Sequence, residues 1–246
     1  MIDLQVEALV ARITLSRPEV RNALDSTAWR QLAAAIAAVG QSDARALVLA
    51  SGVEGSFCAG SNLEEIAQLV GSEERRAPFR AMMRDALDPL ARLPMPVVAV
   101  IDGDCFGAGV ALALACDIRV AGLRARFCIP AARLGVSYPP EDIARLIDCI
   151  GQGQAGRMLY EGALLDPAEA LRIGLVERLS EDAAAEAERI ARRITDNAPA
   201  SVAQLKRIVT RAESVDEGNA GFDRLMGSDA LREGLRAFRE KRAPRF

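Results

Sequence analysis

The 246-residue chain contains no histidine, and this absence restricts its chemistry more than any other feature of its composition. Catalytic triads and cysteine dyads use histidine as the general base, and histidine is also the commonest metal ligand. Histidine-dependent triads and dyads and histidine-ligated metal sites are therefore excluded. Acid–base steps in this protein must use Asp, Glu, Tyr, Cys, Lys or water, and we predict no metal site.

Long apolar runs and paired cysteines are also missing. No uncharged apolar stretch reaches about 18 residues, so we expect no membrane span, and Met1–Leu4 does not begin a signal peptide. The net charge of −3 argues against general binding of nucleic acid or anionic membrane. The cysteines form no C-x-x-C pair, which indicates free thiols in a reducing cytoplasm; they are Cys58, Cys105, Cys116, Cys128 and Cys149.

The hydrophobic residues, 50% of the chain, follow strand patterns first and helix patterns later. This order predicts an α/β core over residues 1–190 and a helical region over 191–246. The expected strands are 4–6, 10–15, 46–50, 96–101, 117–121, 125–129 and 175–176. The expected helices are one capped by Asp25, one from Leu63, and 78–92, 109–115, 141–150, 154–160, 167–173, 181–195, 199–213 and 216–241.

Two segments carry most of the functional information: Phe57–Leu63 (FCAGSNL) and Asp102–Gly109 (DGDCFGAG). Each is interpreted as a glycine-containing turn that opens into a helix. Small residues at such turns let backbone N–H groups approach a ligand closely. Two N–H groups aimed at one point would form an oxyanion hole, which suits an enzyme that builds negative charge on a carbonyl oxygen.

In this order and spacing, the two turns resemble those of the crotonase superfamily, also called the enoyl-CoA hydratase/isomerase family. Further segments are similar to family segments and extend the resemblance over nearly the whole chain. They are Leu15–Leu24, Ala115–Ala121, Leu134–Val136, Asp166–Val176 and the tail Phe238–Phe246.

The resemblance implies a spiral of β-β-α repeats with a C-terminal helical region that forms a homotrimer or a dimer of trimers. It also implies an acyl-CoA substrate, a CoA thioester, with no additional cofactor. The backbone N–H groups of Ser61 and Ala108 would form the oxyanion hole, although the family usually has glycine at the second position. Neighbouring substrate-binding positions would be Ala59, Gly60, Asn62, Leu63, Gly107 and Gly109.

The chain departs from the family at the catalytic carboxylates. Family hydratases hold a water molecule with two glutamates, and the matching positions here, beside the substrate, are Ala111 and Ala131. A later acidic position, used by some isomerases, falls near Pro139. The resemblance therefore implies a lyase or isomerase that cannot use the two-glutamate hydration mechanism.

Tyr138 and Glu141 are the remaining catalytic candidates. The stretch Leu134–Tyr138 (LGVSY) is similar to family methylmalonyl-CoA decarboxylases, whose tyrosine faces the reacting carboxylate. Decarboxylation needs no enzyme base, because the departing CO₂ leaves its electron pair behind. Tyr138 alternatively packs in a loop with its hydroxyl in water. Glu141 is a substitute carboxylate, with Asp142 beside it, or both simply begin a helix, where acidic residues are favoured.

The CoA moiety has four candidate contacts. Arg17, Arg21 and Lys241 are basic residues suited to phosphates, and the family tail implies that Phe238 and Lys241 reach a neighbouring subunit's site. Three hypotheses follow for the protein. It is an enolate-stabilising acyl-CoA enzyme, a decarboxylase of the (methyl)malonyl-CoA type that uses Tyr138, or a non-catalytic protein that binds CoA thioesters.

Overall fold

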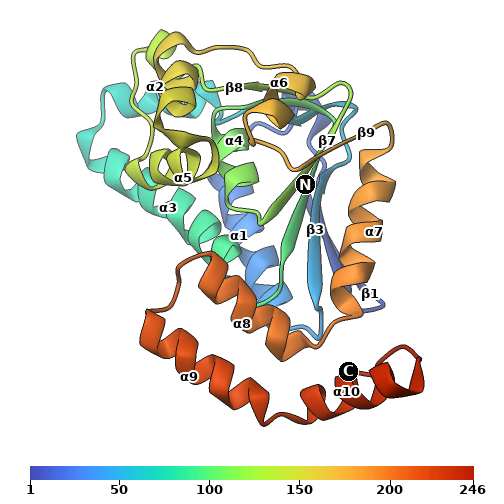
Figure 1. The fold of residues 1–246 in the computed structure, drawn as a ribbon. Helices are drawn as coiled ribbons and strands as arrows, with labels where there is room; N and C mark the ends of the chain where they lie inside the picture. The colour runs from blue at the N-terminus through green and yellow to red at the C-terminus, as the bar shows by residue number, and fades with distance from the viewer.

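The computed structural model describes residues 1–246 and contains two sheets, of which the smaller lies at one end of the larger (Figure 1). The larger sheet begins with the antiparallel hairpin of β1 (Ile2–Glu7) and β2 (Val10–Leu15). Its other strands, all parallel to β2, follow in the order β3 (Ala46–Ser51), β5 (Val97–Ile101), β7 (Ile118–Gly122) and β9 (Arg178–Ser180).

The smaller sheet consists of three short parallel strands, β4 (Gly55–Cys58), β6 (Gly103–Phe106) and β8 (Arg126–Cys128). Each follows a strand of the larger sheet after a short connection and is followed by helical structure. The helices after the first two are α2 (Leu63–Val70) and α4 (Ala108–Leu114). The predicted α/β fold with β-β-α repeats is therefore confirmed. The interpretation of Asp102–Gly109 as only a turn was wrong, because β6 fills half of it.

Helices cover both faces of the larger sheet. On one face, α1 (Ser26–Gly40) and α3 (Glu73–Arg92) enclose the main core, in which Trp29 is fully buried. Asp25 caps α1 as predicted, by accepting the Ala28 N–H at 2.8 Å. On the other face, α7 (Ala183–Thr195) packs small alanine side chains onto the valines of β3, β5 and β7. The boundary expected at residue 190, between the α/β core and the C-terminal helical region, falls inside α7.

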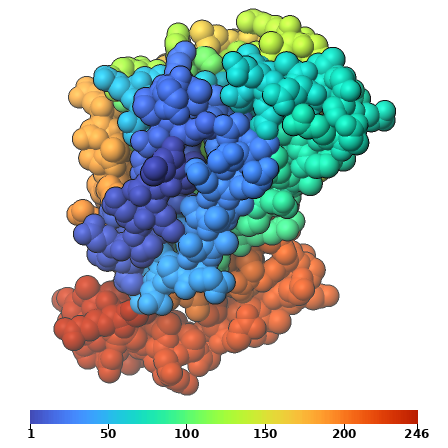
Figure 2. Space-filling model, turned by 180° about the vertical axis from the view of Figure 1, so that it is seen from behind, coloured from blue at the N-terminus to red at the C-terminus, as the bar shows by residue number.

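The C-terminal helices form an arm along one end of the molecule (Figures 1 and 2). They are α8 (Pro199–Val209), α9 (Val215–Met226) and α10 (Asp229–Glu240). Lys206 of α8 ties the arm to the core, because its buried Nζ donates to Asp117 Oδ2 at 2.7 Å and to the Met95 carbonyl at 3.0 Å. No helix in the structure combines the length and apolar character needed to cross a bilayer.

Several predicted element boundaries were wrong. The strand expected at 175–176 lies two residues later, as β9. Leu175 and Val176 are instead core residues that follow α6 (Pro167–Arg172). Residues 216–241 form two helices rather than one, since Gly227 ends α9 and Ser228 caps α10 by accepting the Leu231 N–H. The helix expected at 199–213 stops at Val209.

Helix α3 extends beyond its predicted limits. It begins at Glu73, five residues before Pro78, and accommodates that proline inside the helix, so that tertiary packing outweighs the local signal of proline. The two helices expected at 141–150 and 154–160 are confirmed. They form the two parts of α5 (Pro140–Gly156), which Gly151 separates with the non-helical angles φ +75° and ψ 159°, and the second part continues as a π-helical turn over Arg157–Glu161.

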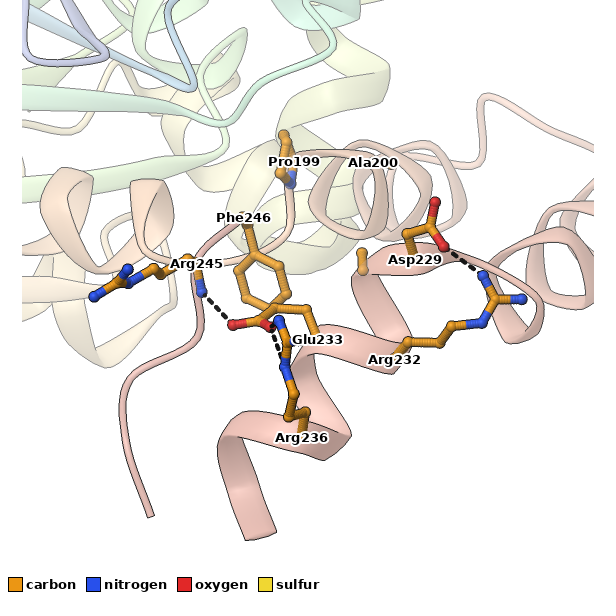
Figure 3. A pocket seen from close by; sticks show the side chains of 9 residues that line it. Pro199, Ala200, Asp229, Arg232, Glu233, Arg236, Arg245 and Phe246 are labelled. Carbon is orange, nitrogen blue, oxygen red and sulfur yellow. Dashed lines mark hydrogen bonds and ion pairs between the residues drawn. The ribbon is translucent and has the colours of Figure 1, made fainter. Parts of the chain in front are cut away.

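The tail after α10 folds back onto this helix around Glu233 (Figure 3). The Glu233 carboxylate accepts hydrogen bonds from Arg236, from Arg242 at 2.7 Å and from the Arg245 N–H at 3.0 Å. These donors, first Arg242 and then Arg236, lower the pKa of Glu233 far below its ordinary value of 4.5. The cluster lines a hollow of about 620 Å³ between α8, α10 and Phe246.

Acid is expected to loosen this tail. A carboxyl group with a lowered pKa stabilises the closed tail fully above its ordinary pKa of 4.5, and this stabilisation is lost as pH falls. At about pH 3.5, proton uptake by the released Glu233 should populate the open tail about tenfold more than at pH 7. Hydrogen-exchange protection factors of the Arg245 N–H measure this change. Glu233→Gln should remove the pH dependence, and equal protection at both pH values would contradict it.

Candidate active site

The first glycine turn is held from both sides by the loop that precedes α1. The Leu24 N–H donates to the Gly60 carbonyl at 2.8 Å, and the Leu24 carbonyl accepts the Asn62 N–H at 2.9 Å. These two bonds flank Ser61, whose own N–H donates to no atom of the chain. The Asn62 side chain caps α2 by accepting the Glu65 N–H at 2.9 Å, and Leu63 starts that helix with an exposed side chain.

The second glycine turn leads from β6 into α4. Gly107 adopts φ +46° and ψ −113°, a conformation that favours glycine, and its N–H donates to the Cys128 carbonyl of β8 at 2.9 Å. Ala108 is the first residue of α4, so its N–H has no acceptor within the helix, and no other group of the chain accepts it. Each turn therefore presents one unpaired backbone N–H.

The two turns approach each other so closely that only glycine fits at their contact. A Cβ atom on Gly60, which has φ +109°, would lie 3.2 Å from the Phe106 carbonyl oxygen and 3.8 Å from the Ala108 nitrogen. A Cβ on Gly109 would lie 2.6 Å from the Cys58 carbonyl oxygen. Because β4 and β6 are paired neighbours, the chain ends that leave them are brought together.

Gly109→Ala should therefore separate the turns and destabilise the protein. The added methyl group has to displace the backbone of β4, since it would also lie 2.9 Å from Cys58 Cβ. Overpacking of this kind typically costs about 1–3 kcal/mol, which urea denaturation would measure. Gly153→Ala in α5 is a matched control, because its Cβ meets nothing within 4 Å and the change should be neutral or stabilising. Equal stability of the two variants would contradict this account.

The buried side chains near the turns provide no free carboxylate. Ala111 lies fully buried in α4 and Ala131 is buried beyond β8. Asp142 is fully buried, but Arg84 contacts both of its oxygens at 2.8 Å. Glu141 is exposed in the first turn of α5 and accepts no hydrogen bond from the chain, as expected of an acidic residue that begins a helix.

Tyr138 lies beside the second turn, and its hydroxyl is engaged. The ring is buried, and the hydroxyl donates to the Gly107 carbonyl oxygen at 2.9 Å. Burial, followed by the nearby charge of Asp142, raises the pKa of Tyr138 well above its ordinary value of 10.0. The phenol therefore remains protonated, and its single hydrogen is directed at the backbone of the turn.

The candidate CoA contacts are dispersed in a single chain. Arg17 is occupied near α1, where Nη2 contacts Asp25 Oδ2 at 2.6 Å. Arg21 is 56% exposed and pairs with the buried Asp104 of β6. Phe238 and Lys241 are exposed at the end of α10, far from α2 and the turns (Figure 1). The structure thus brings only Arg21 to the strands that support the turns.

The cysteines beside the turns serve as packing residues. Cys58 and Cys105 are fully buried, and burial raises the pKa of the Cys58 thiol to about 12. A thiol with so high a pKa is a poor nucleophile at neutral pH. All five cysteines are free.

Asn22 was not predicted from the sequence, although its side chain holds the start of the first turn. This residue is 1% exposed and has φ +58°, a left-handed conformation for which asparagine is enriched. Its Nδ2 donates to the Phe57 carbonyl at 3.0 Å, and its Oδ1 accepts the Arg17 N–H at 2.8 Å. An asparagine between a predicted strand and a helix cap was the available signal.

Comparisons with known proteins identify the family. Residues 5–246 match the family model described as enoyl-CoA hydratase/isomerase. The chain is 35% identical to the mitochondrial enoyl-CoA hydratase domain-containing protein 2 of Bos taurus, over 96% of this chain and 84% of that protein. It is 31% identical to the short-chain-enoyl-CoA hydratase of Clostridium acetobutylicum, over 97% and 94% of the two chains.

A solved structure of an enoyl-CoA hydratase/isomerase family protein from Hyphomonas neptunium superposes with a TM-score of 0.95. Its sequence is 32% identical, and the match covers 100% of this chain and 97% of that one. Family model, relatives and fold all point to one assignment. The chain belongs to the enoyl-CoA hydratase/isomerase family, the crotonase superfamily.

Proposed function

We propose that this protein transforms an acyl-CoA thioester by stabilising its enolate with the backbone N–H groups of Ser61 and Ala108. The observation that carries the proposal is the convergence of two glycine turns, each with an unpaired N–H. Charge that collects on a thioester oxygen strengthens such hydrogen bonds in the transition state, which is the condition for catalysis. The substrate would lie along Ala59, Gly60, Asn62, Leu63, Gly107 and Gly109.

We propose that this protein does not use the two-glutamate hydration mechanism. Ala111 and Ala131 are buried residues without a polar side-chain atom, and the fully buried carboxylate nearby, Asp142, is held by Arg84. Glu141 is an exposed carboxylate, and it would have to reach the substrate from the start of α5. We therefore place the protein among lyases or isomerases that obtain their enolate without such a pair.

Decarboxylation is the second candidate, and the uncharged residues Ala111 and Ala131 favour it. In a (methyl)malonyl-CoA-type reaction, the bond to the carboxylate carbon breaks, CO₂ leaves, and the electron pair becomes the enolate. Water or another donor then protonates the α-carbon, so no enzyme base is required. A direct bond from Tyr138 to the substrate carboxylate would require its hydroxyl to leave the Gly107 carbonyl.

A product screen tests these functions. The pure protein is incubated separately with crotonyl-CoA, methylmalonyl-CoA and malonyl-CoA, and the masses of the products are measured by mass spectrometry. We expect no enzymatic hydration of crotonyl-CoA, and loss of CO₂ from a malonyl ester would establish the second candidate. Rapid hydration would contradict our interpretation of Ala111 and Ala131. Tight binding of all three esters without turnover would instead favour a non-catalytic thioester-binding protein.

We further propose a homotrimer or dimer of trimers, in which the exposed Phe238 and Lys241 reach the CoA site of a neighbouring subunit. Their distance from the turns of their own chain supports a contact in trans (Figure 1). Arg21 is the preferred phosphate contact within the chain, since Arg17 is occupied by Asp25. Five free cysteines fit a reducing compartment, and we propose the cytoplasm.

A further inference from the structure

The peptide unit that joins Gly107 to Ala108 has one end held and one end free. Its carbonyl oxygen accepts three hydrogen bonds: from the Tyr138 hydroxyl at 2.9 Å, from the Val110 N–H at 2.9 Å and from the Ala111 N–H at 3.2 Å. Its N–H, on Ala108, has no acceptor. In a trans peptide the two groups point in opposite directions, so whatever orients the carbonyl also orients the N–H.

Of the three donors, only Tyr138 lies outside α4. The Val110 and Ala111 amides belong to that helix and move with it, whereas Tyr138 lies 31 residues away in the sequence, just before α5. Its backbone is restricted because Pro139 and Pro140 follow it. The ring is also buried. The phenol therefore ties the peptide to the segment that precedes α5, at a glycine with no side chain of its own to limit rotation.

We propose that Tyr138 is a positioning residue: its bond to the Gly107 carbonyl directs the Ala108 N–H toward the thioester oxygen. This inference rests on the proposed oxyanion hole and assigns Tyr138 a role without substrate contact. A donor on the carbonyl side also polarises the peptide, which strengthens the hydrogen bond that the N–H can donate.

The role predicts a specific spectroscopic effect. The probe is butyryl-CoA labelled with ¹³C at the thioester carbonyl, a saturated ester that can be neither hydrated nor decarboxylated. Isotope-edited infrared difference spectra report the carbonyl stretch of the bound ester, which moves to lower frequency as hydrogen bonds to the oxygen strengthen. In Tyr138→Phe we expect a clear loss of this shift with little change in butyryl-CoA affinity. Turnover of any substrate found in the product screen should fall about tenfold.

Tyr160→Phe is the matched control, because Tyr160 is the only other tyrosine and its side chain is 82% exposed. It should leave both the shift and the turnover unchanged. An equal carbonyl shift in the wild type and in Tyr138→Phe would overturn the inference and reduce Tyr138 to a packing residue. Absence of any shift in the wild type would instead overturn the proposed oxyanion hole, so the two failures are distinguishable.

Discussion

Ala108→Pro is expected to lower kcat/KM by about 10²–10³-fold, the usual effect of removing one oxyanion donor. Proline deletes the backbone N–H and puts its Cδ atom in the place of the hydrogen, so no donor can face the thioester oxygen. Ala108 is the first residue of α4, where the N–H has no intrahelical partner and proline is well tolerated. The measurement is turnover of the thioester identified by the product screen, together with the carbonyl stretch of bound butyryl-CoA, which requires no turnover.

Ala108→Val is the control for this change, because valine has as many side-chain carbons as proline but keeps the N–H. Ala108 is almost fully buried, and each variant adds two carbons there, so any loss of Tm from overpacking should be similar in the two. A proline variant that retains wild-type turnover and carbonyl shift would show that the Ala108 N–H does not bind the thioester oxygen. A loss of equal size in both variants would point to crowding of the pocket instead.

Arg84→Met is expected to lower the free energy of unfolding by about 3 kcal/mol at neutral pH, the range for breaking a buried ion pair. For a chain of this size, such a loss lowers Tm by about 6–12 °C. Asp142 is fully buried and would keep only the Arg145 guanidinium, whose Nη1 lies 3.2 Å from Oδ1. Thermal and urea unfolding at one fixed protein concentration provide the measurement.

The loss should depend on pH in a defined direction. Burial already raises the pKa of Asp142 above its ordinary value of 3.8, and removal of Arg84 raises it further. A buried carboxyl group destabilises the fold least when it is protonated and neutral. The loss of unfolding free energy in Arg84→Met should therefore be small in acid and reach its full size above the pKa of Asp142 in the folded variant. Unfolding free energies measured across this pH range test the sign.

Two further variants separate the ion pair from general packing. Arg84→Met combined with Asp142→Leu removes both charges and should recover most of the loss. Arg145→Met removes a more exposed partner, 24% accessible, and should cost about 1 kcal/mol or less. If the double variant is no more stable than Arg84→Met alone, the contribution of the pair lies in packing between α3 and α5 rather than in charge.

The glycine turns were accessible from the sequence because their requirement is local. Gly60 and Gly107 adopt backbone conformations that other residues rarely reach, so the residue type itself marks the position. Asp25 likewise predicted the start of α1, because aspartate is a residue type that commonly caps helices. The resemblance also predicts that Ala111 and Ala131 occupy the positions of the family's two glutamates, and this stays a prediction.

Two of the three short strands were not predicted from the sequence. Strands β4 and β6 contain four residues each, too few to show an alternating pattern, whereas β8 lies within the strand expected at 125–129. Their existence depends on pairing with one another across the smaller sheet, and Gly103 fits there because a Cβ would lie 2.2 Å from the Gly55 carbonyl carbon. Sequence reasoning therefore assigned β6 to a turn.

The sequence alone determined that the protein lacks histidine chemistry, contains two glycine turns, and has alanine at residues 111 and 131. Only the tertiary structure decided what surrounds those turns. Tyr138 bonds to Gly107 across 31 residues, and Asp142 pairs with Arg84 across 58. Such contacts arise from the packing of distant elements and leave no periodic or local signal in the chain. The donors of the proposed site were therefore visible in the sequence, whereas the groups that orient them required the fold.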